Sequence, residues 1–194
     1  METTVLTDPA YTVPQCPPAE TGIAWLRANV ARFSDGPAHT RRRRLIDDLL
    51  AALTVVPRPG ADPTATLLAA LGLPPELAAD VDTIATAYHP HQPATREADT
   101  AVERLATACG GHDEQAAAKI CVLVQAHAAT RALITQLRSG GEGPPVPVTR
   151  RVDPHGRTVE VDLTEAPYGA GPHACPGRDL AQRLARAAIS HPIP

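Results

Sequence analysis

Apolar residues recur every three to four positions along most of the chain, the spacing that places them on one face of an α-helix. Turn-forming residues separate these stretches. One such turn is Ser34-Asp-Gly-Pro37, where the side chain of Ser34 or Asp35 is expected to cap the helix that follows. The pattern predicts helices over Ile23 to Val30, from this turn to Leu53, over 62–79, Val81 to Tyr88, Thr95 to Cys109, about Asp113 to Leu137, and from Arg178 onward.

The segment from Val146 to Asp162 has a different pattern, because apolar and charged residues alternate along it. This alternation predicts a β-hairpin with its turn at 153–156. Prolines at positions 9, 14, 17 and 18 make the variable N-terminal segment, residues 1–35, irregular rather than strand. The sequence therefore predicts a single, mainly α-helical domain over 1–194 with a small β-hairpin, whose last part, 140–194, holds the hairpin, a cysteine-containing loop and a helix.

Composition changes this picture in two respects. Hydrophobic residues make up 43% of the chain and aromatic residues only 3%, so the core is expected to be aliphatic and able to enclose a large flat cofactor. The net charge of −3 argues against a nucleic-acid partner and against attraction to an anionic membrane. No apolar run approaches membrane-spanning length, and the four cysteines lack short metal-ligand spacing. A soluble, reduced, cytoplasmic protein is the expectation.

The loop at 168–181 has the most distinctive chemistry in the chain. It reads Tyr168-Gly-Ala-Gly-Pro-His-Ala-Cys-Pro-Gly-Arg-Asp-Leu-Ala181, so glycines flank a single cysteine on both sides. Cys175 lies just before a predicted helix N-terminus and close to His173, and both features favour the thiolate over the thiol. A thiolate in such a loop could attack a substrate or bind a soft metal.

This loop resembles the cysteine-ligand loop of the cytochromes P-450, the haem-thiolate monooxygenases. The pattern of that family is F-x-x-G-x-H/R-x-C-x-G followed by a Leu-Ala helix, and Tyr168 takes the place of the aromatic residue. The resemblance implies that Cys175 is the proximal ligand of the iron of haem b. It places next to the cofactor the residues Tyr168, Gly169, Gly171, His173, Gly177 and Ala181.

Two further stretches resemble segments that hold the haem propionates in this family. Residues 36–45 resemble the C-helix, written H-x-x-x-R, with His39 and Arg43 as the matching pair. Residues 145–152 resemble the segment after the K-helix, in which Arg151 is the matching arginine by register, with the adjacent Arg150 left open. The two other arginines of the first stretch, at positions 41 and 42, are expected on a solvated basic face.

The long helix resembles the I-helix that crosses the distal face of the haem. Its A-G-x-D/E-T pattern reads Ala126-His-Ala-Ala-Thr130 here, so Thr130 matches the alcohol that helps deliver protons, while Ala129 replaces the acid. One hypothesis is that His127 takes over from the acid as proton donor or binds the iron directly. The alternative is a histidine that is packed against a neighbouring helix and hydrogen-bonded there.

Several parts of the family pattern are missing. No E-x-x-R motif occurs in the chain, and the meander before the cysteine loop and the N-terminal sheet are absent from the sequence. The chain is about half the length that the resemblance would lead one to expect. The resemblance thus implies a reduced P-450-like helical haem domain, as if a full enzyme had been shortened to the parts that contact haem.

Three functions follow from the resemblance. The first is a haem-thiolate oxidoreductase with monooxygenase-type oxidation of a small organic molecule in bacterial specialised metabolism, supplied by a ferredoxin-type redox partner or by peroxide. The second is a non-oxidative haem enzyme, a dehydratase or isomerase, which fits the lost acid and His127. The third is a catalytically degenerate haem-binding helper protein, which fits the missing segments. Aliphatic side chains are expected to be exposed where the missing helices would otherwise pack. This exposed aliphatic surface predicts a homodimer.

Overall fold

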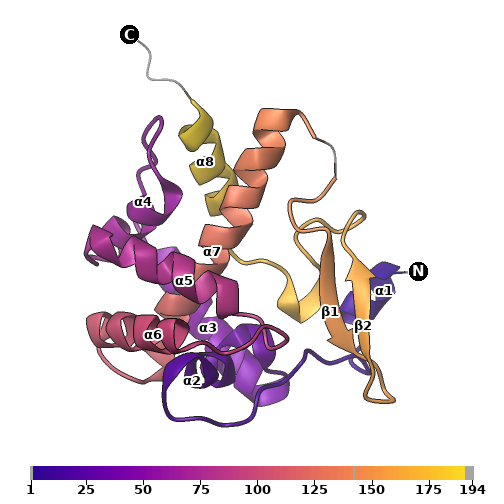
Figure 1. Cartoon of the computed structure of the whole chain (residues 1–194). Coiled ribbons are helices and arrows are strands. Elements are labelled where there is room, and N and C mark those ends of the chain that lie inside the picture. The colour runs from indigo at the N-terminus through magenta and orange to yellow at the C-terminus, as the bar shows by residue number, and fades with distance from the viewer. Residues whose placement is uncertain (1, 142, 191–194) are drawn as a thin grey trace.

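Residues 2–141 and 143–190 are described by a computed structural model, which is mainly helical with one two-stranded antiparallel sheet (Figure 1). Most helices gather around α7, and the β-hairpin stands to one side with α1 against β2. The elements are α1 (Glu2–Thr7), α2 (Gly22–Asn29), α3 (Gly36–Ala52), α4 (Pro63–Ala70), α5 (Ala78–Ala87), α6 (Arg96–Cys109), α7 (Glu114–Ser139), β1 (Val148–Val152), β2 (Thr158–Asp162) and α8 (Arg178–Ile189), with 3-10 turns η1 (Ala31–Phe33), η2 (Pro75–Leu77) and η3 (Gly171–His173).

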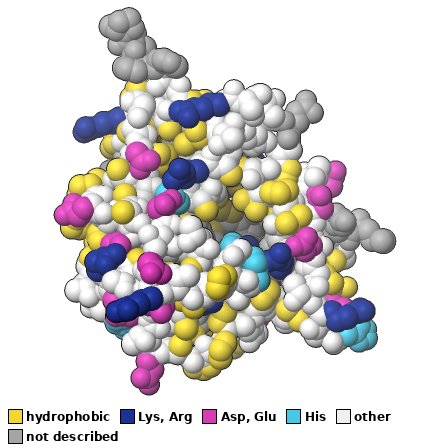
Figure 2. Space-filling view, viewed as in Figure 1, with side chains coloured by type: hydrophobic (Ala, Val, Ile, Leu, Met, Phe, Trp, Pro, Cys, Tyr) yellow, Lys and Arg dark blue, Asp and Glu magenta, His cyan; other side chains and the backbone are white. Residues whose placement is uncertain are grey.

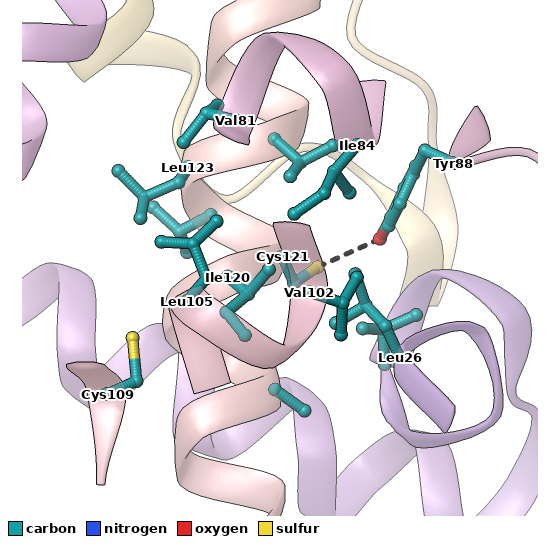
Figure 3. Close-up of a cluster of buried hydrophobic side chains, with 14 of the residues drawn as sticks. Leu26, Val81, Ile84, Tyr88, Val102, Leu105, Cys109, Ile120, Cys121 and Leu123 are labelled. Atoms are coloured by element: carbon teal, nitrogen blue, oxygen red, sulfur yellow. Dashed lines mark hydrogen bonds between the residues drawn. The ribbon is translucent and has the colours of Figure 1, made fainter. Parts of the chain in front are cut away.

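Helix α7 is the central element of the core. The Asp113 carboxylate caps its first turn by accepting the N–H of Ala116 at 2.7 Å, and Gly140 ends the helix with a φ of 64°. By length and composition alone α7 could cross a membrane, and half of its apolar window is buried inside the protein. Figure 3 shows the aliphatic cluster in which it packs, formed with Leu26, Val81, Ile84, Val102, Leu105, Ile120 and Leu123.

Most predicted helices are confirmed within one or two residues, but the helix predicted over 62–79 extends too far. The helix α4 ends at Ala70 because Gly72 adopts a positive φ of 68°, and Pro74 cannot continue the helical hydrogen bonding. The N–H of Leu73 instead bonds to the carbonyl of Leu68 at 2.9 Å, which closes the helix end. The two helices α4 and α5 therefore pack separately against α7.

The N-terminal segment is more regular than its prolines suggested. It contains α1, and Thr12 pairs with Val152 of the hairpin as an isolated antiparallel bridge. Leu6 of α1 packs against Val161 and Leu163 in a small second core. The segment therefore joins the hairpin to the rest of the molecule.

The expectation that Ser34 or Asp35 caps α3 through its side chain is also wrong. Asp35 occupies the N-cap position without a side-chain cap hydrogen bond. Its carboxylate instead accepts the N–H of Val13 at 3.0 Å and lies 3.1 Å from His173 Nε2. Ser34 donates its hydroxyl to the carbonyl of Val30. Asp35 is thus used to join distant segments.

The arginines of the basic face expected at residues 41 and 42 form a clamp between α3 and α7. Glu114, the first residue of α7, accepts from the guanidinium of Arg41 at 2.7 Å and from that of Arg42 at 2.8 Å. The side chain of Arg42 is only 14% exposed. These two arginines therefore fix α3 against α7 and are not free for a partner.

Replacing Glu114 with glutamine is expected to destabilise the protein at neutral pH. The bonds from Arg41, and then those from Arg42, hold the pKa of Glu114 at about 2, below its ordinary value of 4.5. A lowered folded-state pKa gives stability above pH 4.5 that is lost as the pH falls toward 2. Because Arg41 is largely exposed, we expect a loss of about 1–2 kcal/mol at pH 7.

Urea unfolding at pH 7 and at pH 3 measures this effect. The difference in stability between wild type and Glu114→Gln should shrink at the lower pH. Asp48→Asn is the matched control, because Asp48 lies 3.8 Å from Arg44 and its side chain is 71% exposed. A Glu114→Gln deficit that is equal at both pH values would contradict the clamp.

Candidate cofactor site

The cysteine loop runs from the hairpin to α8 and passes beside α1. The N–H of Cys175 bonds to the carbonyl of Tyr168 at 2.8 Å. Gly171 has a φ of 66°, and a Cβ added there would lie 2.9 Å from the carbonyl oxygen of Leu6. Glycine is therefore required at this position both for its backbone conformation and for the close approach of α1.

The thiol of Cys175 is exposed, but its electrostatic surroundings differ from the expectation of a ready thiolate. The protein around the sulfur raises the pKa of the thiol by desolvation, which outweighs the opposing effects of the Gly177 N–H, Arg43 and Arg32. His173 does not supply the charge that was expected, because burial and the nearby His39 lower its pKa to about 4. In this structure Cys175 is accordingly an accessible thiol.

His39 and His173 come together although they lie far apart in the sequence. Their ring centroids are 4.1 Å apart, and Asp35 Oδ1 lies 3.1 Å from His173 Nε2. His39 is 7% exposed, and burial, followed by the charge of Arg43, lowers its pKa. His39 of α3 and His173 of the cysteine loop thus lie in one site. Both of their rings are neutral at pH 7.

Arg43 has a different environment from the one its sequence match implied. Its guanidinium donates to the carbonyl of Ala174 at 2.7 Å, to that of Pro172 at 3.1 Å and to the carboxylate of Asp47 at 2.8 Å. These bonds hold the cysteine loop against α3. Arg43 is therefore already paired and acts on the loop rather than as a free group for a propionate.

The hairpin separates the two arginines that the sequence left open. Side chains alternate between the faces of a strand, so Thr149 and Arg151 lie on one face and Arg150 on the other. Arg151 is 4% exposed, whereas Arg150 pairs with Glu160 across the exposed face at 2.9 Å. Of the two, Arg151 is the one that faces the interior.

His127 is a packing residue between three helices. Its Nδ1 lies 2.8 Å from the hydroxyl of Thr64 in α4, and its Nε2 lies 2.9 Å from the carboxylate of Asp82 in α5. Both ring nitrogens are occupied by protein partners in this structure, and a role of His127 in binding iron or donating protons stays a prediction. The alternative of a hydrogen-bonded packed histidine describes the geometry.

Replacing His127 with alanine is expected to destabilise the fold by about 1–3 kcal/mol, because Thr64 and Asp82 lose their shared partner. Urea unfolding measures this loss, and the absorption spectrum of the haem-reconstituted variant should match that of the wild type. A changed Soret band with unchanged stability would restore His127 as an iron ligand. His155→Ala, in the exposed hairpin turn, is the control.

Thr130 lies one turn further along α7 and is fully buried. Its Oγ1 is the buried side-chain polar atom without a hydrogen-bond partner in the described residues. A buried hydroxyl without a partner costs free energy and points to a group that completes its bonding. Ala126, four residues earlier, packs beside the main core.

The remaining matched residues support the start of α8. Arg178 lies over the ring of Tyr168 with 4.8 Å between its guanidinium carbon and the ring centroid, and Gln182 donates to the Tyr168 hydroxyl at 3.1 Å. The N–H of Ala181 bonds to the carbonyl of Gly177 at 2.9 Å. Gly169 has a φ of 74° and allows the loop to turn.

Figure 2 shows the surface hollowed between the helical part and the hairpin, with histidine and arginine side chains at the edge of the hollow. Within the described parts of the chain, no group of three or more His, Cys, Asp or Glu side chains could hold a bare metal ion. The exposed Cys175 would instead be able to hold the iron of a haem through its sulfur.

Comparison with solved structures identifies the architecture. The chain aligns with P450BioI, solved in complex with acyl carrier protein ligated to hexadec-9Z-enoic acid, at a TM-score of 0.65 and 15% identity, over 97% of this chain and 81% of that chain. It aligns with CxnD, a cytochrome P450 enzyme for C–S bond formation in chuangxinmycin biosynthesis, at a TM-score of 0.60 and 16% identity, over 96% and 76% of the two chains. The chain has a truncated cytochrome P-450 fold.

A third P-450 structure, CalO2, aligns with a TM-score of 0.65 and 16% identity, over 96% of this chain and 79% of that chain. No protein-family model and no curated protein matches the sequence. The resemblance inferred from the cysteine loop and the helical fold with a small hairpin are thereby confirmed. At this level of identity the likeness concerns the P-450 fold, and the roles of individual residues remain predictions.

Proposed function

We propose that the chain binds haem b through Cys175 and acts as a haem-thiolate oxidoreductase that oxidises a small organic molecule. The observation that supports this most is the exposed Cys175, which lies just before the start of α8 within a P-450 fold. Bound haem would supply iron for redox chemistry and would itself favour the thiolate of its sulfur ligand.

Residues close to the cysteine loop fit this cofactor. His39, His173 and Arg151 provide imidazole and guanidinium donors for its two carboxylates, which otherwise are costly to bury. Arg43 holds the carbonyls of the cysteine loop and so positions Cys175. Thr130 offers a buried hydroxyl that can accept and donate a hydrogen bond, as a proton-transfer group requires.

The finer assignment is a monooxygenase-type reaction in bacterial specialised metabolism. The electrons for this reaction would come from a ferredoxin-type protein or from peroxide. The protein would be cytoplasmic, would form a homodimer, and would bind neither nucleic acid nor a membrane. One structural relative was solved with an acyl carrier protein, and another forms a C–S bond in a biosynthetic route. A small organic substrate, free or attached to a carrier, is consistent with both.

A second candidate follows from Ala129, which leaves Thr130 without an adjacent carboxylate. A haem protein that lacks this acid suits non-oxidative chemistry, such as that of a dehydratase or isomerase, or a helper role without catalysis. Oxidant-free turnover would favour the first of these, and a change only in the stability of a partner enzyme would favour the second.

The test is reconstitution with haem, followed by the spectrum of the reduced, carbon-monoxide-bound protein and by assays of oxygen or peroxide consumption. A thiolate-type Soret band together with an oxygenated product supports the proposal. A histidine-type band, or no uptake of haem, overturns it.

A further inference from the structure

One edge of the β-hairpin carries backbone groups that point away from the sheet. The N–H of Thr12 bonds to the carbonyl of Val152 at 3.0 Å, and the N–H of Val152 bonds to the carbonyl of Thr12 at 2.8 Å. The backbone groups of Val152 therefore point away from β2. Alternate residues of an antiparallel strand direct their N–H and C=O groups to the same edge, so those of Val148 and Arg150 point to this outer edge as well.

These outer backbone groups are open to a further strand. Outside the ladder with β2, no hydrogen bond to the N–H or C=O of Val148 or to the N–H of Arg150 occurs in the described parts of the chain. The Arg150 carbonyl accepts from Arg151 Nη1 at 2.9 Å, which leaves it a second lone pair. Pro147 does not protect the edge, because its missing N–H falls on the side of β2, where its carbonyl accepts from Leu163 at 2.9 Å.

The N-terminal segment of the chain does not fill this edge. Continued in register from Thr12, the segment would place Pro14 opposite Arg150. Proline has no N–H to donate to the Arg150 carbonyl, so the pairing stops after one residue. Residues 13–19 then form neither helix nor strand. The edge beyond Thr12 is thus left for a segment from outside the chain.

The open edge lies beside the hollow. Figure 1 shows β1 on the side of the hairpin nearer to the helices, while α1 packs on β2, and Figure 2 shows the surface hollowed between the two parts. The loop between α5 and α6 comes close to the hairpin, since desolvation and then the charge of Arg150 lower the pKa of His91. A neighbouring strand needs only about 4.8 Å beside β1. The space therefore suits one extended segment, whereas a second copy of the chain would bring its helices with it.

The side chains along the edge indicate which segment fits. Val146 and Val148 are 36% and 40% exposed, so the start of the edge is apolar. The other end carries Arg150. Burial, followed by charges that include those of Arg32 and Arg150, holds the pKa of His89 at about 4. The edge is accordingly apolar at one end and lies in a positive field at the other.

We propose that the outer edge of β1 binds an acidic peptide in an extended conformation. The peptide adds a strand antiparallel to β1, as Thr12 does for one residue, and its backbone bonds to Val148 and Arg150. This direction places an acidic residue opposite Arg150 and later residues opposite Val148 and Val146, so the preferred order from the N-terminus is acidic-x-apolar-x-apolar. The role of the peptide as a substrate rests on the proposed haem function, whereas its binding to the edge does not.

Fluorescence anisotropy of a labelled peptide measures this binding without haem. The probe is Glu-Thr-Val-Thr-Val, blocked at both ends, and it should bind the apoprotein. An N-methyl group on its central valine removes the donor to the Val148 carbonyl, and we expect about tenfold weaker binding. The reversed order, Val-Thr-Val-Thr-Glu, moves the acid away from Arg150 and should also bind more weakly. Equal binding of the three peptides, or binding of none, overturns the proposal.

Val148→Pro tests the same contact from the side of the protein. The substitution removes an N–H that points outward, so the ladder with β2 is kept, and the affinity for the probe should fall about tenfold. Val56→Pro is the matched control, because Val56 is 68% exposed in the loop between α3 and α4. Equal affinities of the two variants overturn the proposal, and so does a dimer that Val148→Pro abolishes while no peptide binds. The N-methylated peptide is tested on the wild type, so the conclusion does not depend on the folding of a variant.

Loading with haem separates this proposal from the proposed function. If the protein binds the peptide and takes up no haem, the proposed function fails and the peptide site stands. If it takes up haem and binds none of the peptides, the peptide site alone fails. A bound peptide that gains one oxygen atom from hydrogen peroxide, with release of water, supports its role as substrate. A peptide that is bound and unchanged by this treatment overturns that role and leaves the binding site in place.

Discussion

Replacing Cys175 with alanine is expected to remove the thiolate-type Soret band from the reduced, carbon-monoxide-bound protein. Cys175 is exposed, whereas Cys109 and Cys121 are buried and Cys16 is half-buried, so no other cysteine is expected to replace it as the ligand. Oxidative turnover should fall at least about a hundredfold, since the ligand that tunes the iron is lost. Absorption spectra and product formation measure the two effects.

Cys16→Ala is the matched control, because it removes a thiol from the N-terminal segment. It should retain the band and the turnover of the wild type. Retention of the thiolate-type band in Cys175→Ala would contradict the assignment of Cys175 as ligand. Far-UV circular dichroism shows whether either variant has lost its helices.

The second large effect is expected from Gly171→Ala. An alanine at a φ of 66° is strained, and its Cβ would meet the carbonyl oxygen of Leu6 at 2.9 Å, so α1 or the cysteine loop must move. Strain and overpacking together should lower the free energy of unfolding by about 2–4 kcal/mol. Because η3 lies two residues before Cys175, the affinity for haem should fall as well.

Gly60→Ala separates the two causes. Gly60 has a similar φ of 73°, but nothing lies within 4 Å of an added Cβ, so only backbone strain of about 1 kcal/mol remains. Urea unfolding of both variants gives the contribution of the contact with α1 as their difference. Equal losses would show that α1 does not press on the cysteine loop.

Local patterns in the sequence were sufficient for much of the fold. The spacing of the apolar residues predicted α2, α5, α6, α7 and α8, and the alternation of apolar and charged residues predicted the hairpin. Both patterns depend only on residues that are close in sequence. The break between α4 and α5 was predicted but placed too late, because residues 71–79 were assigned to the first helix although Gly72 turns the chain out of it. The cysteine loop indicated the P-450 fold, since its residues are contiguous.

Residue roles that depend on distant partners could not be predicted in this way. A match to H-x-x-x-R identifies Arg43, but only the folded chain shows that the carbonyls of Pro172 and Ala174 occupy it. Likewise, His127 is a packing residue because of Thr64 and Asp82, which lie 63 and 45 residues away.

The position of Asp35 has a consequence for how the protein folds. Its carboxylate joins residues 22 and 138 positions away, whereas α5 and α6, like α6 and α7, pack against neighbours in sequence. Closing a long loop costs more entropy than closing a short one, so the helices around α7 are expected to assemble first. Contacts made after the transition state control the rate of unfolding more than the rate of folding. The contacts of Asp35 are therefore expected to form late in folding and to slow the unfolding of the protein.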